Sequence, residues 1–399
     1  MNILIINSGS SSMKFQIFDM KNKSAICKGL VERIGIDGAL TFQAEGSEKI
    51  KLATSIPDHK TAIDIALKQV TASDTGVLKS LSEIDAVGHR IVHGGSTLTK
   101  PEIIGSDVEE KIEKNSVLAP LHNPAGLLGI RAVRSILPEI PHAASFDTAY
   151  YSGMKKEAYL YALDYECYSV QGYRKFGFHG ASHQYVNLRG SELSGRQRDD
   201  FRSVSCHIGG GVSLAASIGC VGVDTSVGYG TVCGVPMGTR SGDVDPEIIL
   251  QLILKDGMSP DEVKELIYKK SGLLGVSGLS SDIRDIISGS RNGNARAELA
   301  LDIFARSIRR YICALAASLN GRMDSLIFTA GIGENSALVR QMICDGLGIL
   351  GIKLDENRNN DCRGEAVIST DDSPVSVLVV PTDEELMIAI ETMKLIKQL

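Results

Sequence analysis

The chain contains the same short pattern twice: an apolar strand, a turn rich in glycine or serine, and a second strand. The first copy covers residues 3–19 with its turn at 7–12, and the second covers 203–218 with its turn at 207–211. A third turn of this kind, at 330–335, follows another apolar strand. Backbone N–H groups exposed in such turns can bind phosphate oxygens. The repetition suggests a duplicated fold with candidate phosphate sites, although each turn alone also fits a purely structural role.

Helices alternate with strands along the whole chain, which indicates the α/β class. Amphipathic or capped stretches predict helices over 60–81, 107–118, 124–137, 259 onward, 295–319 and from 382 to about 397. Further strands are expected at 26–34, 39–43, 84–92, 143–146, 325–329 and 375–380. The pattern starts again after about residue 150, so we expect two domains, and 399 residues is a suitable length for two.

Composition excludes several classes of protein. Lys and Arg number 42 against 48 Asp and Glu, a net charge of −6, which argues against a nucleic-acid or anionic-membrane binder. The eight cysteines form no C-x-x-C pair and fit no zinc spacing, so we expect reduced thiols. No apolar stretch is long enough to span a membrane, and residues 1–7 lack the basic start of a secretory signal. The sequence therefore predicts a cytoplasmic protein.

Two arginines stand in unusual surroundings. Arg90 lies inside an apolar strand, where a charge is costly unless it is paired or faces a cleft. Arg240 lies in a loop, 237–246, that is rich in glycine and carboxylates, and a planar guanidinium suits carboxylate and phosphate oxygens. Asp147, which ends its strand, is either a base or water-holding carboxylate or a simple turn and helix cap.

Histidines and a glutamate pair are further candidates. His179 and His183 have H-x-x-x-H spacing, but the Glu of the H-E-x-x-H motif is absent and Gly180 weakens a helix there. A single histidine that stabilises charge is favoured over a metal site. Glu384 and Glu385 either cap the last helix or hold hydrated Mg²⁺.

The glycine turns match neither common nucleotide motif. The segment 9–14 is too short for a Walker A loop. Gly331 and Gly333 are followed by Ser336, so the dinucleotide fingerprint is incomplete. A strand-turn-strand phosphate clasp fits the sequence better, and a dinucleotide enzyme is the weaker alternative.

Taken in order, these segments resemble the acetate kinase (acetokinase) family of short-chain carboxylate kinases. The resemblance runs from Asn7–Ser12 to Pro381–Glu385 and so covers nearly the whole chain. Its most specific segments are Gly88–Gly95, Ala119–Pro124, Gly177–Gly180, Met237–Asp245, Ser271–Gly278 and Phe328–Ser336.

The resemblance implies a duplicated two-domain fold of the actin-like ATPase type, with the active site in a cleft between the domains. Residues 1–150 would form the first domain, with helix 384–399 packed back on it, and 151–383 the nucleotide-binding and dimerisation domain. The implied reaction is ATP + acetate ⇌ ADP + acetyl phosphate with Mg²⁺ or Mn²⁺, in a homodimer.

The resemblance also implies roles for the residues that handle the acid and the transferring phosphoryl group. Arg90 would bind the substrate carboxylate, and a small apolar pocket for its methyl group would be formed by Val92, Leu121 and Phe178. The phosphoryl group would be surrounded by Asp147, His179 and Arg240.

The remaining implied residues bind the metal and the nucleotide. Asn7 and Glu384 would position Mg²⁺. The residues expected near the phosphates are Ser10, Ser12, Lys14, His207, Gly209 and Gly211. The residues expected to line the adenosine site are Asp282, Ile283, Arg284, Gly331 and Asn335.

The chain departs from the family pattern at three positions. Gly210 replaces the Asn of the usual His-Leu-Gly-Asn-Gly turn, Tyr151 stands where a His is frequent, and Thr231 replaces a pocket Pro. These departures leave open a propionate or butyrate kinase, another phosphoryl donor such as pyrophosphate, and a non-catalytic nucleotide sensor. Arg90, Asp147, His179, Arg240 and Glu384, present together, favour the enzyme.

Overall fold

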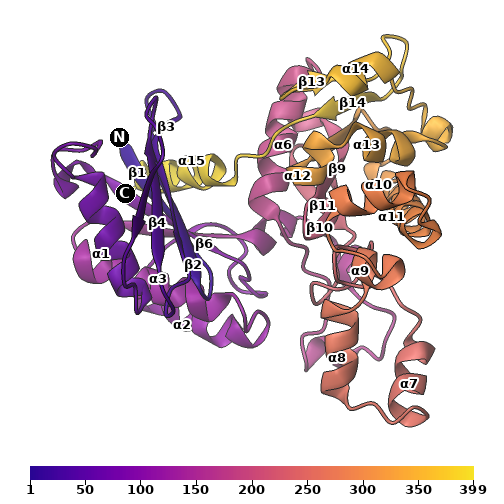
Figure 1. The fold of residues 1–399 in the computed structure, drawn as a ribbon, viewed down its shortest axis with the longest axis horizontal. Coiled ribbons are helices and arrows are strands. Elements are labelled where there is room, and N and C mark those ends of the chain that lie inside the picture. The colour runs from indigo at the N-terminus through magenta and orange to yellow at the C-terminus, as the bar shows by residue number, and fades with distance from the viewer. The chain divides into compact units, whose positions relative to one another are not determined.

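The computed structural model describes residues 1–399, which divide into two compact units (Figure 1). The first unit contains Met1–Tyr150 and Asp383–Leu399, and the second contains Tyr151–Thr382. Each unit is built around one β-sheet covered by helices on both faces.

The first unit has an eight-stranded sheet in the order β5-β4-β3-β2-β1-β6-β8-β7. Strands β1 to β5 form an antiparallel meander, whereas β6 and β8 run parallel to β1 and β7 pairs antiparallel to β8. The strands are β1 (Asn2–Ser8), β2 (Ser12–Asp19), β3 (Ser24–Glu32), β4 (Ala39–Ala44), β5 (Ile50–Ala53), β6 (Ala86–Ile91), β7 (Glu102–Ile103) and β8 (His142–Phe146).

Helices cover both faces of this sheet because β1 is apolar on both sides. Leu4 and Ile6 belong to the core that α1 and α3 help to form, while Ile5 points to the opposite face, towards α15. Figure 1 shows α15, in yellow, beside β1 although it ends the chain. The helices are α1 (His59–Val70), α2 (Ser106–Lys114), α3 (Asn123–Ile136) and α15 (Glu384–Ile396), with 3₁₀ turns at Leu81–Glu83, Asn115–Val117 and Asp147–Tyr151.

The second unit has a six-stranded sheet in the order β11-β10-β9-β12-β14-β13. Its antiparallel run β11-β10-β9, followed by the parallel strands β12 and β14, repeats the order and directions of β3-β2-β1-β6-β8. The duplicated fold expected from the two strand-turn-strand segments is therefore confirmed. The strands are β9 (Arg202–Ile208), β10 (Val212–Ile218), β11 (Val221–Thr225), β12 (Ser325–Thr329), β13 (Ala366–Val367) and β14 (Ser376–Val379).

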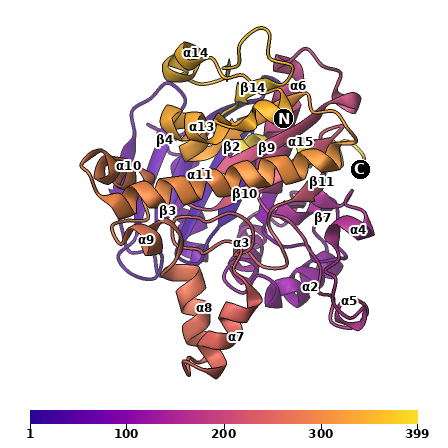
Figure 2. The same cartoon turned by 90° about the vertical axis from the view of Figure 1, so that its right-hand side faces the viewer.

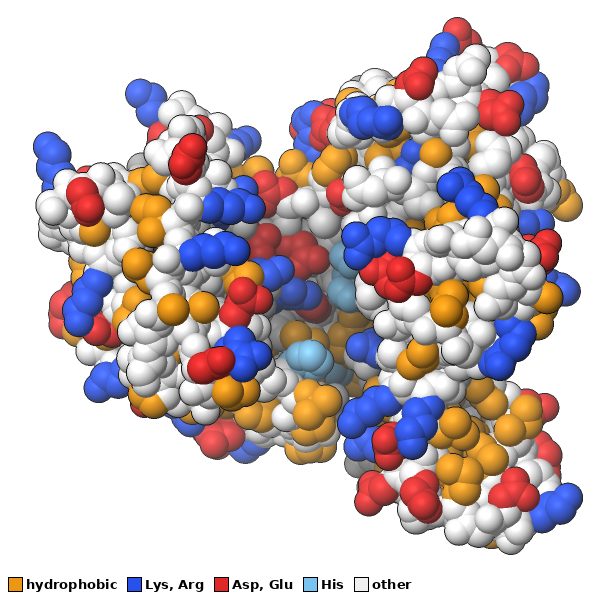
Figure 3. Space-filling model, viewed as in Figure 1, with side chains coloured by type: hydrophobic (Ala, Val, Ile, Leu, Met, Phe, Trp, Pro, Cys, Tyr) orange, Lys and Arg blue, Asp and Glu red, His pale blue; other side chains and the backbone are white.

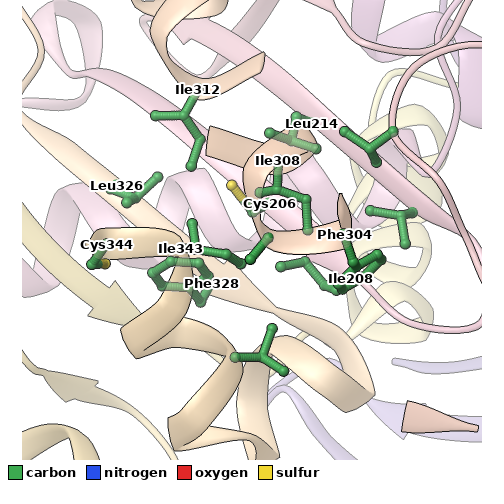
Figure 4. Packing of buried hydrophobic residues seen from close by; sticks show 14 of the residues in the cluster. Cys206, Ile208, Leu214, Phe304, Ile308, Ile312, Leu326, Phe328, Ile343 and Cys344 are labelled. Carbon is green, nitrogen blue, oxygen red and sulfur yellow. The ribbon is translucent and has the colours of Figure 1, made fainter. Parts of the chain in front are cut away.

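The two faces of the second sheet differ in character. Val204 and Cys206 of β9 point to the long helix α11, which lies across β9 and β10 in Figure 2 and packs as shown in Figure 4. Ser203 and Ser205 alternate with them and point to the opposite face, towards α6. The face towards α11 is thus an apolar core, whereas the face towards α6 carries buried serines of β9 beside an apolar cluster that includes Ile327 of β12 and Leu378 of β14.

The helices of the second unit are α4 (Lys156–Tyr159), α5 (Glu166–Ser169), α6 (Gly180–Leu193), α7 (Pro246–Leu254), α8 (Pro260–Lys269), α9 (Gly272–Ser277), α10 (Ile283–Arg291), α11 (Ala295–Ala316), α12 (Ala330–Asn335), α13 (Ala337–Cys344) and α14 (Glu356–Asp361). Shorter 3₁₀ turns lie at Arg198–Asp200, Ala317–Leu319 and Leu347–Leu350. Helix α7 exposes apolar side chains, and Figure 3 shows such side chains gathered where α7 and α8 lie. None of the helices combines the length and hydrophobicity that crossing a bilayer requires.

Three local predictions were wrong in detail. The helix expected over 60–81 ends at Val70, because the segment 71–76 is rich in Thr, Ser, Asp and Gly, which favour turns. The turn expected at 207–211 begins only after Ile208, which still belongs to β9. The turn expected at 330–335 is the short helix α12.

Gly88 in β6 allows α15 to approach the sheet closely. A Cβ atom at this position would lie 2.5 Å from Thr392 Oγ1 and 2.8 Å from Ile5 Cδ1. Real Cβ atoms do not approach other atoms so closely, so any side chain here would push α15 away from β1 and β6.

We expect Gly88→Ala to lower the free energy of unfolding by about 1–3 kcal/mol, because the new methyl group overpacks the interface with α15. Urea denaturation followed by circular dichroism measures this loss. Gly348→Ala is the matched control, since a Cβ there would meet no atom within 4 Å and its φ is not positive. Equal stability of the two variants would contradict this account of the helix–sheet contact.

Candidate active site

Arg90, near the end of β6, is held by two carboxylates of the first unit. Its Nε and Nη2 atoms donate to Asp147 Oδ1 at 3.0 Å and Oδ2 at 2.8 Å, and Nη1 lies 3.0 Å from Glu384 Oε2. The three side chains are 18%, 3% and 15% exposed. Burial opposes the charge of Arg90, but the two carboxylates outweigh burial and raise its pKa. Both oxygens of Asp147 accept hydrogen bonds from Arg90, and burial raises the pKa of this carboxyl while the charge of Arg90 opposes the rise.

The start of α15 adds further acidic groups to this cluster. Burial raises the pKa of the Asp383 and Glu385 carboxyls, and the charge of Glu384 raises both further. Asp383 also caps α15 by accepting a hydrogen bond from Leu386 N at 2.9 Å. Arg90 therefore interacts with three carboxyl groups, those of Asp147, Glu384 and Glu385.

The hairpin turn between β1 and β2 lies in the same unit. Asn7 is half-buried near the end of β1 and pairs across the hairpin with Lys14. Gly9 N donates to Ser12 O at 2.8 Å and closes the turn, which leaves Ser10 exposed at its tip. Lys14 is exposed and interacts electrostatically with Glu385, so it belongs to the surroundings of the acidic cluster.

The residues expected to contact a methyl group have unequal exposure. Val92, just after β6, is half-buried, and Leu121 is 75% exposed. Phe178 belongs to the second unit and is buried, and its carbonyl accepts a hydrogen bond from the Tyr151 hydroxyl at 2.8 Å. Gly177 makes room for the Tyr151 ring, because a Cβ there would lie 2.5 Å from it.

His179 begins a cluster of histidines in the second unit. It precedes α6 with φ 54° and ψ 35°, and its ring stacks on that of His207 with 4.1 Å between centroids. His179 Nδ1 lies 2.8 Å from Ser213 Oγ, and His207 Nδ1 lies 2.8 Å from Ser182 Oγ. His183 bonds to Ser205 and Ser213 through its two ring nitrogens. These hydroxyl partners fit the expectation of a histidine that acts on charge better than a metal site.

Arg240 lies beside this cluster and differs from Arg90 in its partners. A Cβ atom built at Gly211 would lie 3.5 Å from His179 Nε2 and 3.9 Å from Arg240 Nη1, so the three positions are neighbours. Arg240 Nη1 donates to Thr231 O at 3.1 Å and lies 3.6 Å from Met237 Sδ, and no carboxylate pairs with the guanidinium. Burial lowers the pKa of Arg240, although an arginine stays charged at neutral pH. It is a half-buried cation with no anionic partner.

The backbone that carries Arg240 is fixed by the neighbouring loop. Met237 N donates to Arg240 O at 3.0 Å, and Leu273 N donates to Met237 O at 2.9 Å. Gly272 has φ +63°, and a Cβ there would lie 2.1 Å from Met237 O, so only glycine fits this close approach. The segment 271–278 therefore holds the Arg240 loop in place.

A cavity of about 1040 Å³ lies in the second unit. Its walls include the whole set expected at the adenosine site, together with Gly209 of the glycine turn. That set is Asp282, Ile283, Arg284, Gly331 and Asn335. The volume suits a ligand of nucleotide size.

Several residues of this set also have structural tasks. Asp282 caps α10 through Arg284 N at 2.9 Å and pairs with the Arg284 side chain at 2.6 Å, which lowers the pKa of Asp282 to about 2. Asn335 Nδ2 donates to Gly331 O at 2.9 Å and closes α12. Their side chains thus shape the rim of the cavity and are kept in place by local bonds.

Sequence reasoning missed the apolar wall of this cavity and the serines behind His179. The apolar wall is formed by Leu273, Ile287, Ile332 and Leu338. Leu273 lies in a segment that the family resemblance includes, but nothing in the pattern assigns it to a ligand. One feature of the sequence could have pointed to Ser205 and Ser213, because each is a polar residue in the middle of a buried strand.

Comparisons with known proteins identify the family. Residues 2–390 match the acetokinase family. Acetate kinase of Bacillus subtilis (strain 168) is 48% identical over 396 residues, 99% of each chain. The crystal structure of Porphyromonas gingivalis acetate kinase superimposes with a TM-score of 0.94 at 42% identity over 99% of both chains. A propionate kinase from Francisella tularensis gives 0.91 at 35% identity over 98% of this chain and 99% of its own. The chain belongs to the acetokinase family.

Proposed function

We propose that this kinase is an acetate kinase that transfers the terminal phosphoryl group of ATP reversibly to acetate. The main support is Arg240, a half-buried cation with no carboxylate partner, beside His179 and the glycine turn at 209–211. A buried charge without a partner is unfavourable in a protein that binds nothing there. A phosphoryl group would supply the missing negative charge.

Arg90 is the proposed carboxylate-binding residue of the first unit. A guanidinium has five N–H donors, and Asp147 takes two of them while Glu384 lies near Nη1. N–H groups on Nη1 and Nη2 therefore remain for a substrate carboxylate. Val92, Leu121 and Phe178 are proposed to contact its methyl group.

Phosphoryl transfer requires alignment and positive charge more than covalent chemistry from the protein. A carboxylate is already a nucleophile at neutral pH, so one of its oxygens attacks the terminal phosphorus while the bond to the ADP oxygen breaks. Arg240 and the N–H of His179 would stabilise the charge that spreads over the equatorial oxygens. Asp147 is proposed to act by holding Arg90, because both of its oxygens are engaged by that side chain.

The acidic cluster of the first unit fits a divalent cation. Asp147, Glu384 and Glu385 all interact with Arg90, and burial together with the charge of Glu384 raises the pKa of Asp147, Asp383 and Glu385. No group of three or more His, Cys, Asp or Glu side chains is arranged to hold a metal by itself. Glu384 and Asn7 offer the oxygen ligands that Mg²⁺ prefers, with nucleotide phosphates and water completing the shell. The cation would neutralise charge on the phosphates.

We also propose that the enzyme is a homodimer.

A propionate kinase is the second candidate, favoured by the similarity to the Francisella tularensis structure and by Thr231 in place of a pocket proline. Because one methylene in an apolar pocket changes discrimination by only ~10–200-fold, both acids are expected to react.

The test of the proposed function is acyl phosphate formation, trapped as the hydroxamate, with acetate, propionate or butyrate and with ATP, GTP or pyrophosphate as donor. We expect kcat/KM to be highest for acetate with ATP, with propionate lower by no more than roughly 200-fold. Higher values with propionate would favour the second candidate. Nucleotide binding without acyl phosphate from any acid would exclude both.

Removal of Arg240 should abolish most of the turnover. We expect Arg240→Ala to lower kcat by roughly 10³-fold, by analogy with arginines that stabilise phosphoryl-transfer transition states. The matched control is Arg131→Ala, whose guanidinium is 48% exposed and pairs with Glu109 and Glu113. A loss of less than tenfold with Arg240→Ala would remove this residue from the mechanism.

Gly210 offers a gain-of-affinity test at the nucleotide cavity. A Cβ at this position would meet no atom within 4 Å and the φ is not positive, so a side chain fits. We expect Gly210→Asn to lower the KM for ATP by roughly twofold to tenfold, the value of one added hydrogen bond. Gly210→Ala, which adds no donor, should leave the KM unchanged. An equal change in both variants would rule out the amide as the cause.

A further inference from the structure

A continuous chain of hydrogen bonds runs behind His179 between β9, β10 and α6. His179 Nδ1 and His183 Nε2 both lie 2.8 Å from Ser213 Oγ. His183 Nδ1 lies 2.7 Å from Ser205 Oγ, and Asn187 Nδ2 lies 3.2 Å from the same oxygen. His183, Asn187, Ser205 and Ser213 are fully buried, so water cannot exchange with these bonds.

The amide of Asn187 gives this chain a direction. Its Nδ2 atom lies 2.8 Å from the backbone oxygen of His183, which can only accept. The end of the amide that faces this oxygen is therefore the NH₂ group, and the same group donates to Ser205. The hydroxyl of Ser203 donates to the other end of the amide, Oδ1. Both ends of Asn187 are thus fixed by partners of known polarity.

The donor and acceptor roles of Ser205 determine which nitrogen of His183 carries the proton. Its hydroxyl accepts from Asn187, and its own proton has one remaining partner, His183 Nδ1. If His183 instead donated from Nδ1, the Ser205 proton would be buried without an acceptor, which is unfavourable. Burial and the neighbouring His207 lower the pKa of His183 well below its usual value, so the ring is neutral and carries its proton on Nε2.

Ser213 is the last link in this chain of hydrogen bonds. Its oxygen accepts from His183 Nε2, so its hydroxyl proton is directed to His179 Nδ1. A ring nitrogen that accepts a hydrogen bond carries no hydrogen of its own. The single ring hydrogen of neutral His179 therefore lies on Nε2. Of the two ring nitrogens, Nε2 is the one near Gly211, 3.5 Å from where a Cβ of Gly211 would lie, and Arg240 Nη1 lies 3.9 Å from the same point.

We propose that Asn187, Ser205, His183 and Ser213 are positioning residues that hold His179 in the tautomer with its proton on Nε2. His179 then presents a neutral N–H donor beside Arg240 without having to become charged. The opposite tautomer would direct a lone pair at the same place, where it would repel a phosphoryl oxygen. The tautomer follows from the hydrogen bonds alone, and its catalytic use rests on the proposed function.

The test is the tautomer of His179 in the full-length protein without substrates, labelled with ¹⁵N-histidine and measured by long-range ¹H–¹⁵N correlation NMR at pH 8. The eight histidines make assignment by a His179→Gln spectrum feasible. We expect a protonated Nε2 and an unprotonated Nδ1, with the minor tautomer at roughly one tenth or less. A proton on Nδ1, or on both nitrogens, would overturn the proposal.

Ser205→Ala and Ser203→Ala form a matched pair of variants. Both serines are buried on β9 and both bond to Asn187, but only Ser205 touches His183. We expect Ser205→Ala to make the two neutral tautomers of His179 comparably populated, and Ser203→Ala to leave the wild-type ratio unchanged. An unchanged ratio in Ser205→Ala, or equal changes in both variants, would contradict the directed chain.

The wild-type spectrum decides the proposal even if Ser205→Ala does not fold. Failure of the proposed function is seen separately, because acyl phosphate formation is assayed with substrates and the tautomer without them. A correct tautomer in a protein that makes no acyl phosphate would leave the hydrogen-bond chain intact and refute only its catalytic use.

Discussion

Parallel pairing next to the first strand of each sheet is the constraint on which both halves of the candidate site depend. Parallel strands place their carboxyl ends at the same edge of a sheet, where open α/β sheets bind ligands. In the first unit Asn7 lies near the end of β1, Val92 follows β6 and Asp147 follows β8. In the second unit Gly209 follows β9 and Gly331 follows β12. The hydrogen-bonded pairing of the strands brings these residues to one edge of their sheet, although they are far apart in the sequence.

The two arginines illustrate how a protein prepares for anions in two ways. Arg90 is neutralised in advance by Asp147 and Glu384, so its geometry is fixed before any acid binds. Bidentate hydrogen bonds orient such a pair, and the carboxylates neutralise most of the charge of the arginine. Arg240 is held only by Thr231 O and a sulfur contact, so its full charge remains available. The arrangement of Arg90 suits a substrate that only has to be positioned. The arrangement of Arg240 suits a group whose charge changes during the reaction.

Sequence patterns predicted what depends on local chemistry. The hairpins, the α/β class and the helix expected from residue 259 onward all followed from short stretches of sequence. The end of α1 at Val70 was missed, although residues 71–76, which follow it, favour turns. The bonds from Asn187 to Ser205 could not be predicted, since they depend on which face of β9 meets α6. Placement of the candidate residues in one working site remains a prediction.

The buried serines on the α6 side of the second sheet have an energetic consequence. Ser205 and Ser213 occupy positions where apolar side chains would pack better, and each buried hydroxyl is tolerated only because it is bonded. The opposite face, with Phe304 and Ile308 of α11 against Cys206, therefore has to supply most of the apolar stabilisation (Figure 4). His179 adds a further cost, because a non-glycine residue at φ 54° is strained. The α11 side of the sheet thus supplies the larger apolar core, while the α6 side combines a smaller apolar cluster with polar groups in a fixed order around a histidine.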